Sequence, residues 1–161
     1  MAKRPGQDSK LLSPGTKAPD FTLHVTPDQT LALSDLAGKP VVLAFYPADW
    51  SPVCGDQMAL YNEALPEFEH MAPQSSVSPS MGRGVMTPSP RLATSTFRCS
   101  PIWSRRERHR QYGAYREGDG FCQRALFVID RDGVNAWNFL SPIAINPSAD
   151  GILDALARLP K

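Results

Sequence analysis

One cysteine of this chain, Cys54, lies in a stretch whose residue types suit a reactive thiol: YPADWSPVCGDQ, residues 46–57. Ser51 stands three residues before it, so its hydroxyl could donate a hydrogen bond to the sulfur or to a bound oxygen atom. Pro47 and Pro52 stiffen the loop and help to hold the thiol in position. The chemistry that this pattern indicates is nucleophilic attack by a cysteine thiolate.

The element that must position Cys54 is a helix that begins close to it. Apolar residues recur with helical spacing from about Cys54 to Met71, and Pro66 is predicted to kink this helix. The first N–H groups of a helix stabilise a thiolate, because they have no intrahelical partner and carry the positive end of the dipole. A cysteine at a helix start is more often a buried packing residue, and that alternative stands beside the reactive one.

The composition limits the classes of protein to consider. The chain has 161 residues, enough for one domain with its own core, and a net charge of +1, which gives no case for nucleic acid or a membrane surface as partner. No apolar run approaches the roughly 20 residues of a membrane span. Three cysteines without a CxxC pair indicate free thiols in a reducing compartment, so we expect a cytoplasmic protein. His24, His70 and His109 lack metal-ligand spacing, so no metal site is expected.

Two apolar runs are predicted to form the central strands. VVLAFYP, residues 41–47, and RALFVID, residues 124–130, are rich in β-branched and aromatic residues, which is typical of strands covered on both faces. RDG is a turn after the second run, and NAWNFL pairs back as a hairpin strand. A closing helix follows over residues 146–159, with Ser148 as its expected N-cap. This order predicts an α/β protein of the thioredoxin-like fold, with a central mixed sheet flanked by helices.

Residues 1–13 are expected to be a flexible arm and residues 14–161 a single domain, with an aberrant segment at residues 72–110. This segment is rich in Ser, Pro and Arg and shows neither helical nor strand periodicity. We therefore expect that the middle strand and crossover helix of the fold are disrupted here. When the third base of each codon is read with the first two of the next, the segment can encode strand-like sequence. We hypothesise that it is frame-shifted, which the coding DNA decides.

The stretch YPADWSPVCGDQ resembles the Pro-x-x-x-Thr/Ser-x-x-Cys signature of the peroxiredoxins, the alkyl hydroperoxide reductase and thiol-specific antioxidant family. Pro47, Ser51 and Cys54 fall on its three fixed positions. Gln57 falls where the family places Glu or Gln. RALFVID resembles the strand on which the family carries its active-site arginine, which gives that role to Arg124. The segment PGTKAPDFTL is similar to the family's opening strand.

The resemblance, which covers roughly residues 14–71 and 111–159, implies a thiol peroxidase. The Cys54 thiolate would attack hydrogen peroxide or an organic hydroperoxide, while Arg124, Ser51 and backbone N–H groups hold the two oxygens. The resulting sulfenic acid would be reduced by a thiol. The resemblance further implies no metal or organic cofactor. It implies an external reductant, either thioredoxin-like or a low-molecular-weight thiol, and a homodimer, which is common in the family.

Cys99 and Cys122 are the candidates for a resolving thiol. No catalytic motif surrounds Cys122, which is interpreted as structural, whereas Cys99 lies in the aberrant segment.

Two alternatives to an active peroxidase stay open. A thiol-disulfide oxidoreductase on the same fold would need a CxxC pair, but the residue three after Cys54 is Gln57. A peroxiredoxin-like chain with an incomplete sheet would be inactive or unstable, and a trapped sulfenic acid at Cys54 would distinguish the enzyme from it.

Overall fold

The computed structural model describes residues 10–26, 29–47, 52–71, 76–80, 108–118 and 120–160. Ser51, Cys99, residues 1–9 of the predicted arm, and residues 72–75 and 81–107 of the predicted aberrant segment lie outside these ranges. Within the described ranges, no helix is long and apolar enough to cross a membrane.

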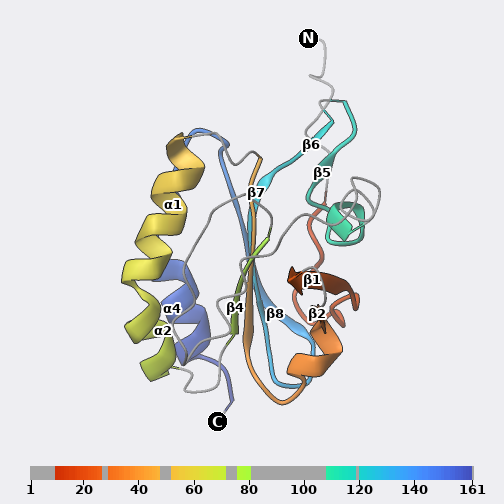
Figure 1. Cartoon of the computed structure of the whole chain (residues 1–161), viewed down its shortest axis with the longest axis vertical. Coiled ribbons are helices and arrows are strands. Elements are labelled where there is room, and N and C mark those ends of the chain that lie inside the picture. The colour runs from red at the N-terminus through yellow and green to blue at the C-terminus, as the bar shows by residue number, and fades with distance from the viewer. Residues whose placement is uncertain are drawn as a thin grey trace.

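A four-stranded sheet forms the centre of the described structure (Figure 1). Its strands lie in the order β4 (Ser76–Ser80), β3 (Val41–Phe45), β7 (Arg124–Ile129) and β8 (Asn135–Ser141). β3 is parallel to β4 and antiparallel to β7, and β7 is antiparallel to β8. The predicted mixed central sheet is confirmed, with the two long apolar runs side by side in its middle.

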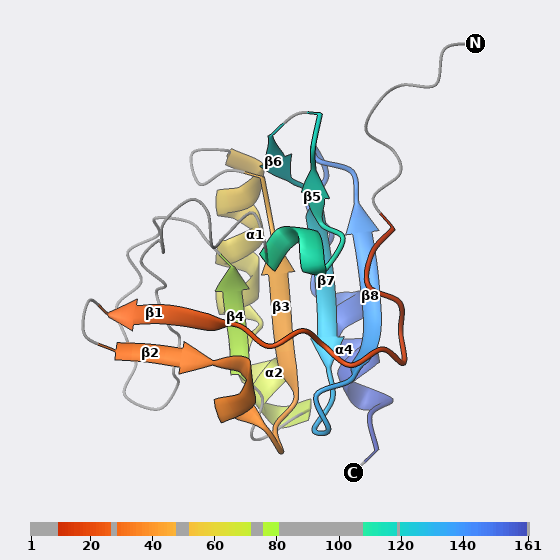
Figure 2. The same ribbon diagram turned by 90° about the vertical axis from the view of Figure 1, so that its right-hand side faces the viewer.

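Three helices form a layer on one face of this sheet: α1 (Pro52–Glu63), α2 (Leu65–Met71) and α4 (Asp150–Ala157). The opposite face carries a hairpin and a 3-10 helix: β1 (Thr22–Thr26), β2 (Gln29–Ala32) and η1 (Leu33–Leu36). Figure 2 shows this hairpin in front of the sheet, on the side away from the helices. A second small hairpin precedes β7: β5 (Tyr115–Arg116) and β6 (Phe121–Cys122).

The two central strands are buried on both faces, as their apolar sequences predicted. Successive residues of a strand point to opposite faces, so β3 and β7 contribute to two separate cores. One core, between the sheet and the helices, includes Val42, Ala44, Leu126, Val128, Phe68 and Ile152. The other core, under the β1–β2 hairpin, includes Val41, Leu43, Phe45, Phe127, Ile129 and Tyr112.

A regular stripe of buried residues fixes how α1 and α2 lie on the sheet. The buried residues are Cys54, Gln57, Tyr61, Ala64 and Phe68. Their alternating spacing of three and four places them on one side of a helix. The helix is interrupted at Ala64, two residues before Pro66, because a proline ring lacks an N–H and clashes with the preceding turn. The predicted kink at Pro66 is therefore confirmed.

The position of β4 corrects the expectation that the middle strand of the fold is disrupted in the segment 72–110. Ser76–Ser80 pairs in parallel with β3 in an unbroken register, from Val41 opposite Ser76 to Phe45 opposite Ser80. β4 lies at the edge of the described sheet, where a residue without an N–H, such as Pro79, is tolerated. Residues 108–111, at the end of the same segment, are helical.

The expected N-cap of the closing helix is also wrong. Ser148 has a φ of 58°, which is the left-handed region and not the extended conformation of an N-cap residue. Its N–H donates to Asn146 Oδ1 at 3.1 Å and its hydroxyl donates to Asp150 Oδ2 at 3.2 Å, so it belongs to a turn before the helix. The N-cap position is occupied by Ala149 instead.

Candidate active site

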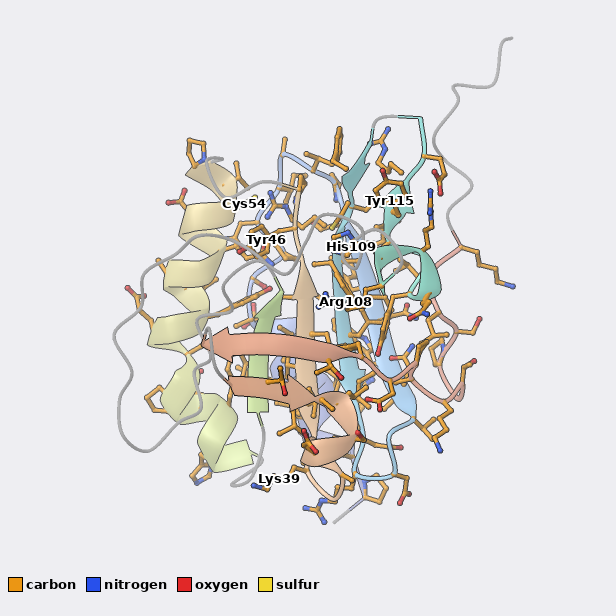
Figure 3. All side chains as sticks on the ribbon, turned by 45° about the vertical axis from the view of Figure 1, so that its right-hand side comes forward. Lys39, Tyr46, Cys54, Arg108, His109 and Tyr115 are labelled. Atoms are coloured by element: carbon orange, nitrogen blue, oxygen red, sulfur yellow. The ribbon has the colours of Figure 1, made fainter. Side chains whose placement is uncertain are left out.

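The site is built where β3 ends and β7 begins. Phe45 is paired with Ala125 in the antiparallel β3–β7 ladder, so Arg124 lies at the end of the sheet from which the chain leaves β3. The chain then enters α1, and Cys54 stands in its first turn, as predicted. Figure 3 shows Cys54 and Tyr46 near this end of the sheet, with Lys39 at the opposite end. The fold therefore brings together two residues that are far apart in the sequence, Cys54 and Arg124.

Arg124 contacts the cysteine directly. Its Nη2 donates to Cys54 Sγ at 3.2 Å, and its Nη1 donates to Gln57 Oε1. Two further bonds, from Nε at 3.1 Å and from Nη2 at 2.8 Å, go to the backbone carbonyl oxygen of Ile143. Arg124 is 0% exposed and Cys54 is 1% exposed. The guanidinium is thus fixed on both sides, with one edge against the thiol.

The arrangement places a buried positive charge against Cys54. Arg124 is fully buried, and a buried charge is costly unless another charge or several hydrogen bonds compensate it. Among the residues that the structure describes, its partners other than the sulfur are the neutral oxygens of Gln57 and Ile143. The guanidinium therefore directs an uncompensated positive charge at the atom in front of it, the Cys54 sulfur. The N-terminal turn of α1 acts in the same direction.

A second buried bond extends the network along α1. Gln57 Nε2 donates to the hydroxyl oxygen of Tyr61 at 3.0 Å. Burial raises the pKa of Tyr61 from its usual 10.0 to about 12, and the hydrogen bond from Gln57 and the charge of Arg124 offset only part of this rise. Tyr61 is therefore a neutral phenol at physiological pH. The four side chains form one connected chain: Cys54, Arg124, Gln57 and Tyr61.

Cys122 has the environment of a structural thiol. It is 3% exposed, and its Sγ donates to the carbonyl oxygens of Tyr46 at 3.4 Å and Gln123 at 3.0 Å. Burial raises its pKa far above the usual value, and the nearby Cys54 acts in the same direction. A thiol that stays protonated is a poor nucleophile, which supports the interpretation of Cys122 as structural.

Three of the predicted site residues lie together in the described structure: Cys54, Gln57 and Arg124. Arg124 bonds to both Cys54 and Gln57. Pro47 lies in the loop after β3, directly after Tyr46, whose carbonyl oxygen accepts a hydrogen bond from Cys122. Ser51 lies outside the described residues. No group of three or more His, Cys, Asp and Glu side chains in the described ranges could hold a metal ion.

Two members of the network escaped the sequence interpretation. Tyr61 has the periodic spacing of an ordinary core aromatic, and its spacing of four from Gln57 was the available signal. Ile143 acts through its backbone oxygen, which no residue type reveals.

Comparison with known proteins agrees with this geometry. The AhpC/TSA family model matches residues 14–77. Peroxiredoxin-1 of Gallus gallus is 31% identical over 150 residues, which cover 86% of this chain and 75% of that protein. Thioredoxin peroxidase of Echinococcus granulosus is 29% identical over 160 residues, which cover 88% of this chain and 78% of that protein. Among solved structures, reduced 2-Cys peroxiredoxin of Plasmodium vivax superimposes with a TM-score of 0.68 at 23% identity, covering 88% of this chain and 79% of that one.

These similarities first define the class of fold: an α/β protein with a thioredoxin-like fold. At the level of the sequence, the chain belongs to the peroxiredoxin family.

Proposed function

We propose that this protein is a thiol-dependent peroxidase that reduces hydrogen peroxide or organic hydroperoxides through Cys54. The thiolate attacks the terminal oxygen of the hydroperoxide, the O–O bond breaks, and the electron pair leaves with the other oxygen as hydroxide or alkoxide, which takes up a proton. Cys54 is thereby oxidised to a sulfenic acid. An external thiol attacks that sulfur and releases water, and a second thiol equivalent restores Cys54.

The contact between Arg124 and Cys54 carries this proposal. A donor 3.2 Å from the sulfur is close enough to reach a peroxide oxygen placed against it, and it is already oriented before the substrate arrives. We assign to Arg124 both the stabilisation of the thiolate and that of the departing oxygen. Gln57 supports Arg124 by accepting a hydrogen bond from it. The sequence pattern indicates that Pro47 stiffens the loop and that the Ser51 hydroxyl donates a hydrogen bond to the sulfur or to the peroxide.

The reductant that we propose is a thioredoxin-like protein or a low-molecular-weight thiol. The name of the Echinococcus relative, thioredoxin peroxidase, supports the first of these. Cys54 and Cys122 are both free thiols, as suits a reducing compartment, and this supports a cytoplasmic location.

We further propose a homodimer that forms along β8. Gly15 and Thr16 bond to the backbone of Asn135 at the start of β8. Beyond that residue no strand of the described structure pairs with the outer edge of β8, which leaves it available to a further strand. The large exposed apolar side chains of the described residues all lie on β8 or shortly after it: Phe139, Leu140, Ile143 and Ile145. An open edge combined with an apolar patch suits a self-complementary contact between two copies.

The test of the activity is consumption of hydrogen peroxide in the presence of dithiothreitol by the purified full chain. We expect catalytic consumption by the wild type and by Cys122→Ser, because the Cys122 thiol stays protonated and donates to backbone carbonyl oxygens. We expect none from Cys54→Ser. Activity that survives Cys54→Ser would contradict the proposal.

A further inference from the structure

Tyr61 is a buried titratable residue to which the proposed reaction gives no task. It is 3% exposed and shares one face of α1 with Cys54 and Gln57, at a spacing of three and then four residues. Its hydroxyl oxygen lies 3.0 Å from Gln57 Nε2 and is the acceptor of that bond. The aromatic ring packs edge-to-face with Phe68, which fixes the position of the hydroxyl.

The donor-only character of arginine decides which way the Gln57 amide points. Arg124 has no acceptor atom, so the Gln57 atom that faces it must be Oε1. Nε2 is then directed to the opposite side, where Tyr61 accepts from it. Gln57 is 0% exposed, and a buried N–H group without an acceptor is costly. The Tyr61 oxygen therefore stabilises the amide orientation that Arg124 requires.

The orientation of the amide in turn fixes the guanidinium. Arg124 is held on one side by the Ile143 carbonyl and on the other by Gln57 Oε1, with Nη2 directed at Cys54. An amide turned by half a rotation would place its NH2 group against the guanidinium, donor against donor. Arg124 would then lose one of the two contacts that align it with the sulfur.

We propose that Tyr61 is a positioning residue for the peroxidase reaction: its hydroxyl fixes the Gln57 amide, and the amide holds Arg124 against Cys54. This inference rests on the function proposed above. Because the phenol stays neutral up to strongly alkaline pH, the alignment is the same across the physiological range.

The test compares Tyr61→Phe with Tyr112→Phe. Tyr112 is an apt control because it is 0% exposed and also loses one hydrogen bond, the partly buried bond from its hydroxyl to Pro19 O at 2.8 Å, but belongs to the core on the other face. Two rates are measured on the Cys54 peptide by mass spectrometry: sulfenic acid formation by hydrogen peroxide and alkylation by iodoacetamide. We expect Tyr61→Phe to slow both by about tenfold, the worth of one buried hydrogen bond, and Tyr112→Phe to leave both unchanged.

A second background distinguishes positioning from loss of structure. In Gln57→Glu, the carboxylate at position 57 has no N–H that needs an acceptor and pairs with Arg124 without help. Adding Tyr61→Phe to that background should change either rate by less than about twofold. Equal slowing in the two tyrosine variants, no slowing in Tyr61→Phe, or full slowing in the Gln57→Glu background would overturn the proposal. Alkylation needs no peroxide, so it decides this point even if the wild type forms no sulfenic acid and the proposed function fails.

Discussion

At the scale of single residues, one buried cation dominates the environment of Cys54. The Arg124 guanidinium makes hydrogen bonds to a thiol, an amide and a backbone carbonyl, each in a fixed direction. The pattern of residue types identified three of the participants, Cys54, Gln57 and Arg124, because their types and positions match the chemistry and the family signature. Tyr61 and the Ile143 carbonyl could not be identified in this way, since a buried aromatic and a backbone oxygen occur in every core.

Arg124→Lys tests whether geometry matters beyond charge. A lysine keeps the positive charge, but its single ammonium cannot reach Cys54, Gln57 and Ile143 together as the planar fork does. We expect the second-order rate constant for hydrogen peroxide to fall on the order of 10²-fold. Stopped-flow measurement of peroxide reduction checks this value, with circular dichroism as the control for folding. A lysine variant as fast as the wild type would show that charge alone suffices.

Tyr61 also predicts how stability changes at alkaline pH. Its pKa is about 12 in the folded protein and 10.0 without burial, so the phenol of the unfolded chain ionises first as the pH rises. Between these values the unfolded state holds fewer protons, and the free energy of unfolding falls with increasing pH. Below pH 10 the contribution of Tyr61 to the free energy of unfolding is fully present. Tyr61→Phe lacks it, so urea titrations should show a smaller loss of stability between pH 10 and 12 than in the wild type. Parallel losses would refute this cause.

At the scale of elements, strands with a strong apolar signal were predicted and strands defined by pairing were not. β3 and β7 follow from their sequences alone, and so does the break before Pro66. β4 is poor in strand-forming residues, and its position is set by its register with β3, which is a long-range constraint. Ser148 matched an N-cap by type, but its left-handed backbone excluded that role. The hypothesis of a frame-shifted segment concerns the coding DNA and stays a prediction.

The approach of the N-terminal segment to the turn after residue 111 gives a sharp prediction for one glycine. Gly113 has a φ of 69°, and a Cβ at this position would overlap the carbonyl oxygen of Lys10. The neighbouring Tyr112 carbonyl accepts from Leu12 N at 3.0 Å, so the two segments cannot easily separate. Gly113→Ala should therefore cost more stability than the roughly 1 kcal/mol expected from backbone strain alone.

Gly133→Ala is the matched control for this prediction. Gly133 has a similar φ of 77°, but a Cβ there would have no neighbour within 4 Å. Thermal unfolding of both variants measures the difference. Equal destabilisation would mean that the contact with Lys10 contributes nothing.

At the scale of the whole molecule, the site and the exposed apolar surface are connected through one segment. Ile143 follows β8, and its carbonyl anchors Arg124 while its side chain is 37% exposed. A partner bound along β8 would therefore lie next to the segment that holds Arg124. The net charge of +1 per chain puts little electrostatic repulsion between two copies.

Leu140→Lys tests the proposed dimer. Leu140 is 43% exposed on the open edge strand, and a lysine there would place a charge in the contact between two copies. We expect sedimentation velocity to show a dimer for the wild type and a monomer for Leu140→Lys. Ala59→Lys, at an exposed position of α1, should stay dimeric. A wild-type monomer, or a dimer unaffected by Leu140→Lys, would contradict an interface along β8.

The most direct test of the central claim is a single-turnover trapping experiment on the full chain. The reduced protein is mixed with one equivalent of hydrogen peroxide in the presence of dimedone, and each cysteine peptide is examined by mass spectrometry. The account predicts a dimedone adduct at Cys54, strongly diminished in an Arg124→Ala variant that keeps its secondary structure, because that cation supplies the charge and the donor for the reaction. A folded wild-type protein without an adduct at Cys54, or one modified only at Cys122, would contradict it.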